Sequence, residues 1–103
     1  MPQTPIYNPN IAAYGAKSVP AFTAATLIKA AKGTLLGIQV LVAGSAPGTV
    51  NDVATLAGVA SDNEVATIPN SVGAASLPAP GIPCLNGIVV TPGTGQTLAV
   101  FYI

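Results

Sequence analysis

Three carboxylates, Asp52, Asp62 and Glu64, are the side chains of this sequence best suited to chemistry. Paired carboxylates act as acid and base in glycosidases, but they need a substrate cleft lined by aromatic and polar groups. With two Phe, three Tyr and no Trp, the chain is not expected to build such a cleft. Histidine is absent, so a Ser-His or Cys-His nucleophile has no base to accept its proton. We therefore expect no enzymatic activity.

The same carboxylates offer oxygen ligands to Ca²⁺, because Asp52 follows Asn51 and Asp62 precedes Asn63 in expected turns. Their spacing does not fit an EF-hand loop. Asp and Asn in turns ordinarily bond nearby backbone N–H groups, and we favour that interpretation. No metal and no cofactor is expected.

Cys84 is the single cysteine, which excludes an intrachain disulfide and a zinc site built from paired cysteines. We expect it to be a small buried residue. The turn Gly93-Thr94-Gly95 lacks the Lys-Ser/Thr pair of a phosphate loop and precedes an expected strand. We interpret it as a hairpin turn.

Charged side chains are scarce: three Lys and three acidic residues in 103, against 50% hydrophobic residues and a net charge of zero. Ordinary globular sequences are about 25% charged. A monomer of this mass exposes ~5,300 Å² by area scaling, and so few charges cannot divide that area into small apolar patches. We therefore expect a subunit of a homo-oligomer whose partners cover much of its surface.

The composition also argues against several partners. Without a basic patch, nucleic-acid binding is not expected. The most apolar window, 35–50, is shorter than the ~20 residues of a membrane-spanning helix and contains Gly and Pro, so no membrane span is expected. The N-terminus has neither the cationic start nor the apolar segment of a secretory signal, which predicts synthesis in the cytoplasm.

Residues 1–21 hold four prolines, which favour an extended arm over a helix or an interior strand. The apolar residues Ile6, Tyr7, Ile11 and Tyr14 are unusual in a disordered tail and are predicted to be partner-binding anchors. We favour docking of the arm on a neighbouring subunit. Folding back onto its own domain remains the alternative.

Residues 22–103 consist of short runs rich in Val, Ile, Thr and Leu that end in Gly, Pro or Asn, a pattern typical of all-β domains. The predicted fold is a small antiparallel β-sandwich or jelly-roll-like barrel with an extended N-terminal arm. Lys32-Gly33 is predicted to connect the first two strands tightly, with Gly33 free to take positive φ. The expected strands are 22–31, 34–43, 49–57, 64–68, 74–78, 86–91 and 96–102.

Both faces of the strand 34–43 are mostly apolar. Alternation predicts that Leu36, Ile38, Val40 and Val42 share one face and that Leu35, Gly37, Gln39, Leu41 and Ala43 share the other. A sheet that faces water on one side carries polar residues there, so this strand is expected in the middle of a sandwich or under a partner.

Three segments resemble the small β-sandwich proteins of tailed-bacteriophage virions, of the head decoration or cement type. They are 35–44 (LLGIQVLVAG) with its Pro-Gly-Thr turn, 68–73 (IPNSVG) and 87–97 (GIVVTPGTGQT). The resemblance covers residues 22–103 and lies in strand and turn motifs. It implies a virion protein, commonly trimeric, that sits on the capsid or the tail.

The leading hypothesis is a structural virion protein, a capsid decoration or cement subunit that forms a homo-oligomer, a trimer being favoured. Its expected partners are its own copies and the major capsid protein or another virion protein. Apolar interfaces and the arm would stabilise the shell. The alternative is a tail or fibre component that binds a receptor or a carbohydrate through the polar stretch 62–71.

Overall fold

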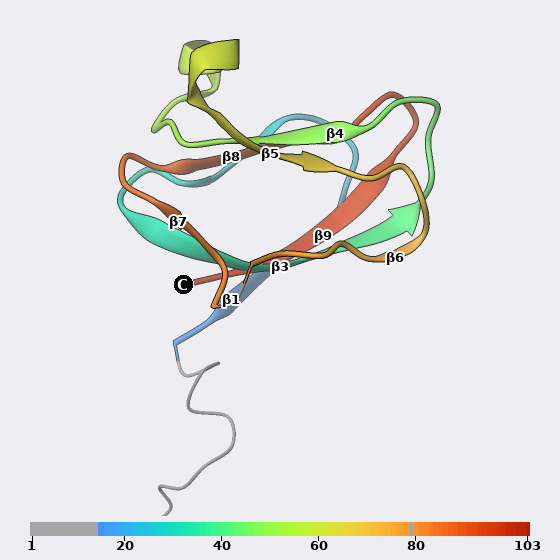
Figure 1. Cartoon of the computed structure of the whole chain (residues 1–103), viewed down its shortest axis with the longest axis horizontal. Coiled ribbons are helices and arrows are strands. Elements are labelled where there is room, and N and C mark those ends of the chain that lie inside the picture. Colours follow the sequence, from blue (N-terminus) through green and yellow to red (C-terminus); the bar gives the residue numbers. More distant parts are fainter. Residues whose placement is uncertain (1–14, 79) are drawn as a thin grey trace, which may run out of the picture.

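The computed structural model describes residues 15–78 and 80–103, which form two antiparallel β-sheets stacked face to face (Figure 1). The small antiparallel sandwich expected from the sequence is confirmed. Sheet 1 has the order β1 (Lys17–Phe22), β9 (Thr97–Tyr102), β3 (Gly33–Val42), β6 (Gly73–Ala74), and β7 (Ile82–Cys84) also pairs with β3. Sheet 2 has the order β2 (Thr26–Lys29), β8 (Ile88–Thr91), β4 (Gly48–Asn51), β5 (Glu64–Ile68). Two 3₁₀ turns, η2 (Leu56–Gly58) and η3 (Ser61–Asn63), lie between β4 and β5.

The core lies between the two sheets and is made of aliphatic side chains. Both sheets contribute residues that are buried almost completely, and Phe22 and Tyr102 pack against this core from its margin. Burial of branched side chains on the inner faces of two sheets is the main stabilising term of such a sandwich. The most completely buried aliphatic residues of the core are Leu35, Ile38, Val40, Leu98 and Val100 from sheet 1 and Val50, Ile68, Ile88 and Val90 from sheet 2.

Strand β3 departs from the alternation that its sequence predicts. Its pairing with β9 shifts register between Leu35 and Gly37, so one additional residue of β3 lies opposite β9 at this point. Such a bulge moves the following side chains to the other face. Leu35, Ile38 and Val40 therefore share the core. Leu36 is not part of this core, so the prediction that it shares a face with Ile38 was wrong. A second shift between Val40 and Val42 leaves Val42 exposed, so the prediction that it shares a face with Val40 was wrong.

The sandwich begins at Lys17, five residues before the boundary expected at residue 22. Residues 17–21 are expected in the arm because proline is excluded from interior strands. They form most of β1, which is an edge strand, and Pro20 is tolerated there because one side of the strand needs no hydrogen bond. The expected strand 22–31 corresponds to β2 and is shorter, because residues 23–25 connect β1 to β2.

The other strands follow the predicted spans with three differences. The expected strand 49–57 ends at Asn51, where the chain leaves sheet 2 and enters the 3₁₀ turns. Ile82–Cys84 forms β7, which was not among the expected strands, and the strand expected at 74–78 is reduced to the two residues of β6. Strand β5 has the predicted bounds.

Most connections cross from one sheet to the other, so the two expected tight connections are not hairpins. Lys32-Gly33 lies between β2 of sheet 2 and β3 of sheet 1, and 92–96 lies between β8 and β9 in the same way. Gly33 is not among the described glycines with positive φ. It is needed because a Cβ at this position would lie 2.7 Å from the Ile103 carbonyl oxygen. In the second turn Gly95 does take positive φ, 78°, and the Gln96 N–H donates to the Gly93 oxygen over 2.9 Å.

Candidate functional site

Asp52, the first of the three carboxylates, joins two distant segments of the chain. Its Oδ1 accepts from the N–H groups of Asn86 (2.8 Å) and Gly87 (3.3 Å), and its Oδ2 accepts from the N–H of Leu85 (3.1 Å). Desolvation alone would raise the pKa of Asp52, but the three donors outweigh it and hold the pKa below its ordinary value. The local Asx turn expected at Asp52 is corrected: its partners lie 33–35 residues away.

Asn63 forms the local turn that the sequence predicts. Its side-chain oxygen accepts from the Ala60 N–H (3.2 Å), and its Nδ2 donates to the Gly58 oxygen (2.8 Å). The buried Asn51 side chain adds two donated bonds, to the Ala60 oxygen (3.0 Å) and to Asn63 Oδ1 (2.8 Å). These amides fold the 3₁₀ segment against the end of β4. Within residues 15–78 and 80–103, no three His, Cys, Asp or Glu side chains come together as a metal site.

Cys84 is buried at the end of β7, as expected. Burial, followed by the negative charge of Asp52, raises the pKa of its thiol to about 11. The thiol is therefore protonated at neutral pH, and a protonated, inaccessible thiol is a poor nucleophile.

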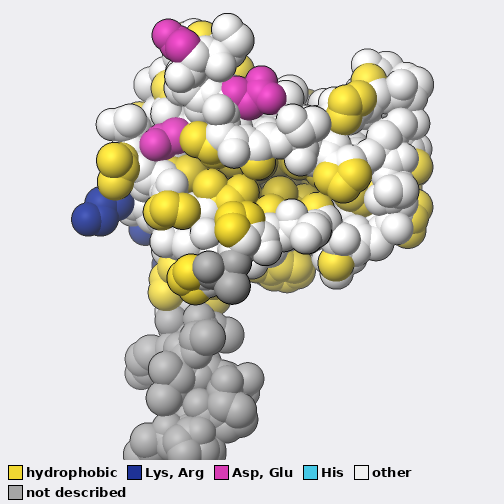
Figure 2. Space-filling model, viewed as in Figure 1, with side chains coloured by type: hydrophobic (Ala, Val, Ile, Leu, Met, Phe, Trp, Pro, Cys, Tyr) yellow, Lys and Arg dark blue, Asp and Glu magenta, His cyan; other side chains and the backbone are white. Residues whose placement is uncertain are grey.

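All six charged side chains lie at one end of the sandwich, where β3 begins and β9 ends. Lys17 pairs with Tyr102 near the end of β9. Lys29 and Lys32 lie at the connection from β2 to β3, just before β3 begins at Gly33. The acidic residues lie at the same end, because Asp52 bonds the segment before β8 and its own N–H donates to the Asn63 oxygen. Figure 2 shows this gathering of Lys, Asp and Glu at one end of the described part.

The opposite end of the sandwich carries no charge and is held by buried amides. Gln96 is fully buried: its Oε1 accepts from the Gly93 N–H (2.9 Å) and its Nε2 donates to the Pro69 oxygen (3.0 Å). Asn70 accepts from the Gly44 N–H over 2.7 Å. The exposed apolar residues Leu41, Val42 and Val72 surround these turns. This end is therefore held by side-chain hydrogen bonds and carries no charge at its surface.

The outer face of sheet 1 is also uncharged along its central strands. Because Leu98 and Val100 point into the core, Ala99 and Phe101 point outward. Their partners on β3 are Gln39 and Gly37, and Ser18 of β1 lies opposite Phe101. The Phe101 side chain is 40% exposed. An aromatic ring among small and uncharged residues is typical of a contact surface.

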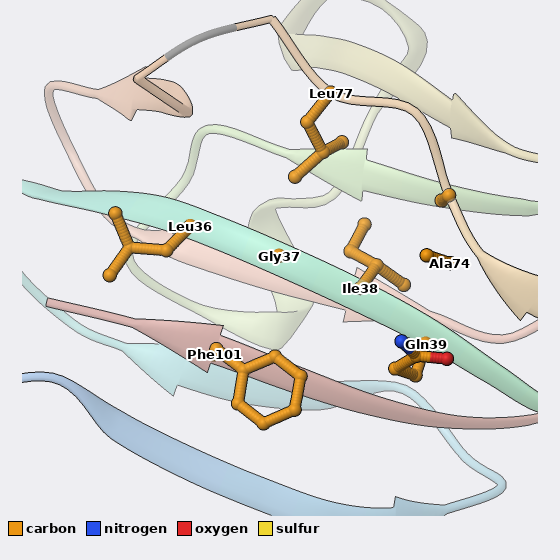
Figure 3. A pocket seen from close by; sticks show the side chains of 8 residues that line it. Leu36, Gly37, Ile38, Gln39, Ala74, Leu77 and Phe101 are labelled. Carbon is orange, nitrogen blue, oxygen red and sulfur yellow. The ribbon is translucent and has the colours of Figure 1, made fainter. Parts of the chain in front are cut away.

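A hollow of about 340 Å³, the Phe101 hollow, lies on sheet 1 beside β3. Figure 3 shows β9 contributing Phe101 on one side of β3 and the segment around Ala74 and Leu77 on the other. Gly37 leaves room beside the ring, because a Cβ there would lie 3.3 Å from Phe101 Cδ2. The lining residues are Leu36, Gly37, Ile38, Gln39, Ala74, Ala75, Leu77 and Phe101.

The outer face of sheet 2 is covered in part by the chain itself. Val89 is completely buried although it does not belong to the core cluster between the sheets. Its pairing partner Asn51 is bonded to the 3₁₀ segment, which stands over this sheet in Figure 1. Sheet 2 therefore has an internal cover, whereas no described residue fills the Phe101 hollow of sheet 1.

The predicted anchors Ile6, Tyr7, Ile11 and Tyr14 lie outside the described residues. The described chain begins at Gly15, where a Cβ would lie 3.8 Å from Ile103 Cδ1. The arm therefore joins the sandwich at its charged end, beside the end of β9. The sequence reasoning did not select Phe101. The alternation of the last strand was the available signal: if Leu98 and Val100 point into the core, Phe101 points outward.

Comparison with protein-family models, with curated proteins and with solved structures gives no match to this chain. In the described part of the chain, no helix has the length and apolar character needed to cross a membrane.

Proposed function

We propose that this protein is a structural subunit of a virion, a capsid decoration or cement protein that assembles with its own copies, a trimer being favoured. Its further partner is the major capsid protein or another virion protein, and its place of synthesis is the host cytoplasm. The proposal is supported by the segregation of charge: one end holds every charged side chain, and the outer face of sheet 1 and the opposite end hold none.

Burial of these uncharged surfaces is the physical basis of the proposed assembly. At about 25 cal/mol per Å² of apolar surface, covering ~1,000 Å² favours association by ~25 kcal/mol before any cost is counted. Loss of translational and rotational freedom opposes this by roughly 4–15 kcal/mol. An interface of ordinary size is therefore sufficient, and the rigid turns around Gln96 keep the ordering cost low.

The alternative, a tail or fibre component that binds a receptor or carbohydrate, has less support. The polar stretch 62–71 contains no aromatic residue on which a sugar ring stacks. The Asn63 and Asn70 amides within it are already bonded to the protein's own backbone. Binding of the full chain to a glycan array would favour this alternative.

The experiment has two parts. Light scattering on the full chain should give a mass near 30 kDa, three times the 10.1-kDa chain, and a stable monomer at high concentration would contradict the proposal. Capsid shells stripped of the chain should then bind it in sedimentation. A variant with Ile6, Tyr7, Ile11 and Tyr14 replaced by Ser should bind at least ~10-fold more weakly, because aromatic and aliphatic anchors dominate interface energetics.

A matched control replaces Leu56, an exposed apolar residue of η2, by Ser. This change should leave binding to shells as it is. Substitution is preferable to truncation at residue 21, because such a truncation removes most of β1 from sheet 1. Equal binding by the four-residue variant and the control would exclude the arm as a clamp.

A further inference from the structure

The Phe101 hollow has the chemistry of a socket for one aromatic side chain that carries a hydroxyl group. Its lining is aliphatic apart from the Phe101 ring and the Gln39 amide. Within residues 15–78 and 80–103, the Gln39 side chain makes no hydrogen bond, so its donor and acceptor are available to a ligand. A tyrosine suits both features, because its ring packs on apolar surface and on another ring while its hydroxyl bonds a polar group.

The chain itself carries the matching side chains in its first 14 residues, outside the described part. Of the two tyrosines there, Tyr14 directly precedes Gly15, which lies beside Ile103. Tyr7 is eight residues from Gly15, and an extended chain of that length reaches roughly 26 Å. Tyr7 is therefore the tyrosine with the freedom to enter a socket away from its own attachment point.

The direction of β1 decides which copy receives the arm. Strand β1 is antiparallel to β9, with Ser18 opposite Phe101 and Lys17 opposite Tyr102. The described chain upstream of Ser18 consequently runs away from Phe101, toward the end of β9. A chain that continues in this direction leaves its own hollow behind, and Pro9 favours an extended course over a sharp return.

We infer that the Phe101 hollow is the docking site for the N-terminal arm of a second copy of this chain, with the Tyr7 ring seated against Phe101 and Gly37 and its hydroxyl bonded to the Gln39 amide. The inference rests on the proposed function, because it requires copies that assemble. It identifies the contact that joins them: the arm of one subunit occupies sheet 1 of the next.

Disulfide trapping tests the contact directly. The Tyr7→Cys variant is mixed with an affinity-tagged Ala74→Cys variant and oxidised, Ala74 being an exposed residue of the hollow. A mixed disulfide between tagged and untagged chains should be the main product. Cys84 is kept in these variants, because its thiol is buried, has a pKa of about 11 and is not expected to react. A Leu56→Cys variant replaces Ala74→Cys in the control and should give at least ~10-fold less mixed product.

The double variant Tyr7→Cys/Ala74→Cys separates docking between copies from docking within one chain. Docking between copies gives a ladder of linked chains on oxidation. A disulfide-closed monomer as the main product shows the arm in its own hollow and overturns the inference. Mixed products equal to those of the Leu56→Cys control overturn it as well.

Filling the hollow gives an independent readout. Gly37→Val places a side chain where Tyr7 would sit, and Gly37 has no positive φ to forbid the substitution. The concentration for half-association should rise at least ~10-fold for Gly37→Val and for Tyr7→Ser, and the double variant should show little further rise, because both remove the same contact. Ala99→Val, on the same face but outside the hollow, should change it less than ~2-fold.

The results distinguish the two proposals. A full chain that forms oligomers whose association is insensitive to Gly37→Val and Tyr7→Ser overturns the socket and leaves the assembly function standing. A full chain that stays monomeric overturns both. Thermal unfolding of Gly37→Val confirms that the variant is folded, and the trapping experiment does not depend on it.

Discussion

Asp52 provides the sharpest test of how this fold is stabilised, because one carboxylate holds the segment 85–87 to the end of β4. Replacing Asp52 by Ala removes all three acceptor contacts. The N–H groups of Leu85 and Asn86 are exposed and regain water, whereas that of Gly87 is buried and loses its only described partner. An unsatisfied buried donor costs about 1–3 kcal/mol, and the two exposed bonds add roughly 0.5 kcal/mol each.

The expected cost of Asp52→Ala is therefore about 2–4 kcal/mol, or roughly 10–30 °C in the melting temperature of a domain this small. Asp52→Asn keeps one acceptor oxygen but loses the charge, so its cost should be about 1 kcal/mol. Urea unfolding at pH 7, with the slope m unchanged, measures both values. Asp62→Asn is the control, since the Asp62 carboxylate accepts no hydrogen bond from the described residues.

The pH dependence of the free energy of unfolding tests the same Asp52 contacts. Because the folded pKa of Asp52 lies below its unfolded value, its contribution is fully present above about pH 4 and is lost as the pH falls through the folded pKa. With three acidic side chains in the chain, few other groups titrate in this window. The wild type should lose more stability than Asp52→Asn between pH 5 and pH 2. Equal losses in the two proteins would refute the assigned role of the carboxylate.

Three further outcomes are expected. Gln96→Met, which keeps the volume but removes the bonds to Gly93 and Pro69, should cost about 2–4 kcal/mol in urea unfolding; a cost below ~0.5 kcal/mol would contradict the bracing role of this amide. Gly93→Ala should destabilise far more than Gly73→Ala, because its Cβ would clash with the Ala46 carbonyl oxygen, whereas the space at Gly73 is open and only its φ of +125° is strained. Thermal melts of the two variants decide the order. Cys84 should react with a thiol reagent at pH 8 at least ~100-fold more slowly in the folded protein than in denaturant, because it is buried and its pKa is raised to about 11, and equal rates would place it at the surface.

The strands that the sequence predicts well are those whose apolar runs are long and bounded by turn residues. Strands β3, β5, β8 and β9 lie within a residue or two of their expected spans. Two strands were not expected as such, β1 and β7, and both contain proline. Proline argues against an interior strand, but these two need hydrogen bonds on one side only. The rule that proline is excluded from interior strands is correct. Whether a strand lies at the edge of a sheet, where proline is tolerated, cannot be read from the sequence.

The arrangement of the strands was harder to predict than their existence. A turn such as Lys32-Gly33 has the same composition whether it joins paired strands or passes from one sheet to the other. What decides is which apolar faces are buried together, a property of residues far apart in the chain. The bulge in β3 illustrates the same limit, because strict alternation assigned Leu35 to the face opposite Ile38 and Val40, and one additional residue placed all three in the core.

The candidate site follows this pattern. Scarcity of charge predicts that part of the surface is covered, but it does not say which part. That requires knowing that Lys17, Asp52 and Glu64, distant in sequence, come together at one end, and that Gly37 lies opposite Phe101 on a face without charge. Aromatic residues near the N-terminus were the natural choice for anchors because they are conspicuous in a Pro-rich segment. The hollow that we propose as the binding site for Tyr7 is recognised only in three dimensions, since a glycine and a phenylalanine 64 positions apart make a hollow only when their strands pair.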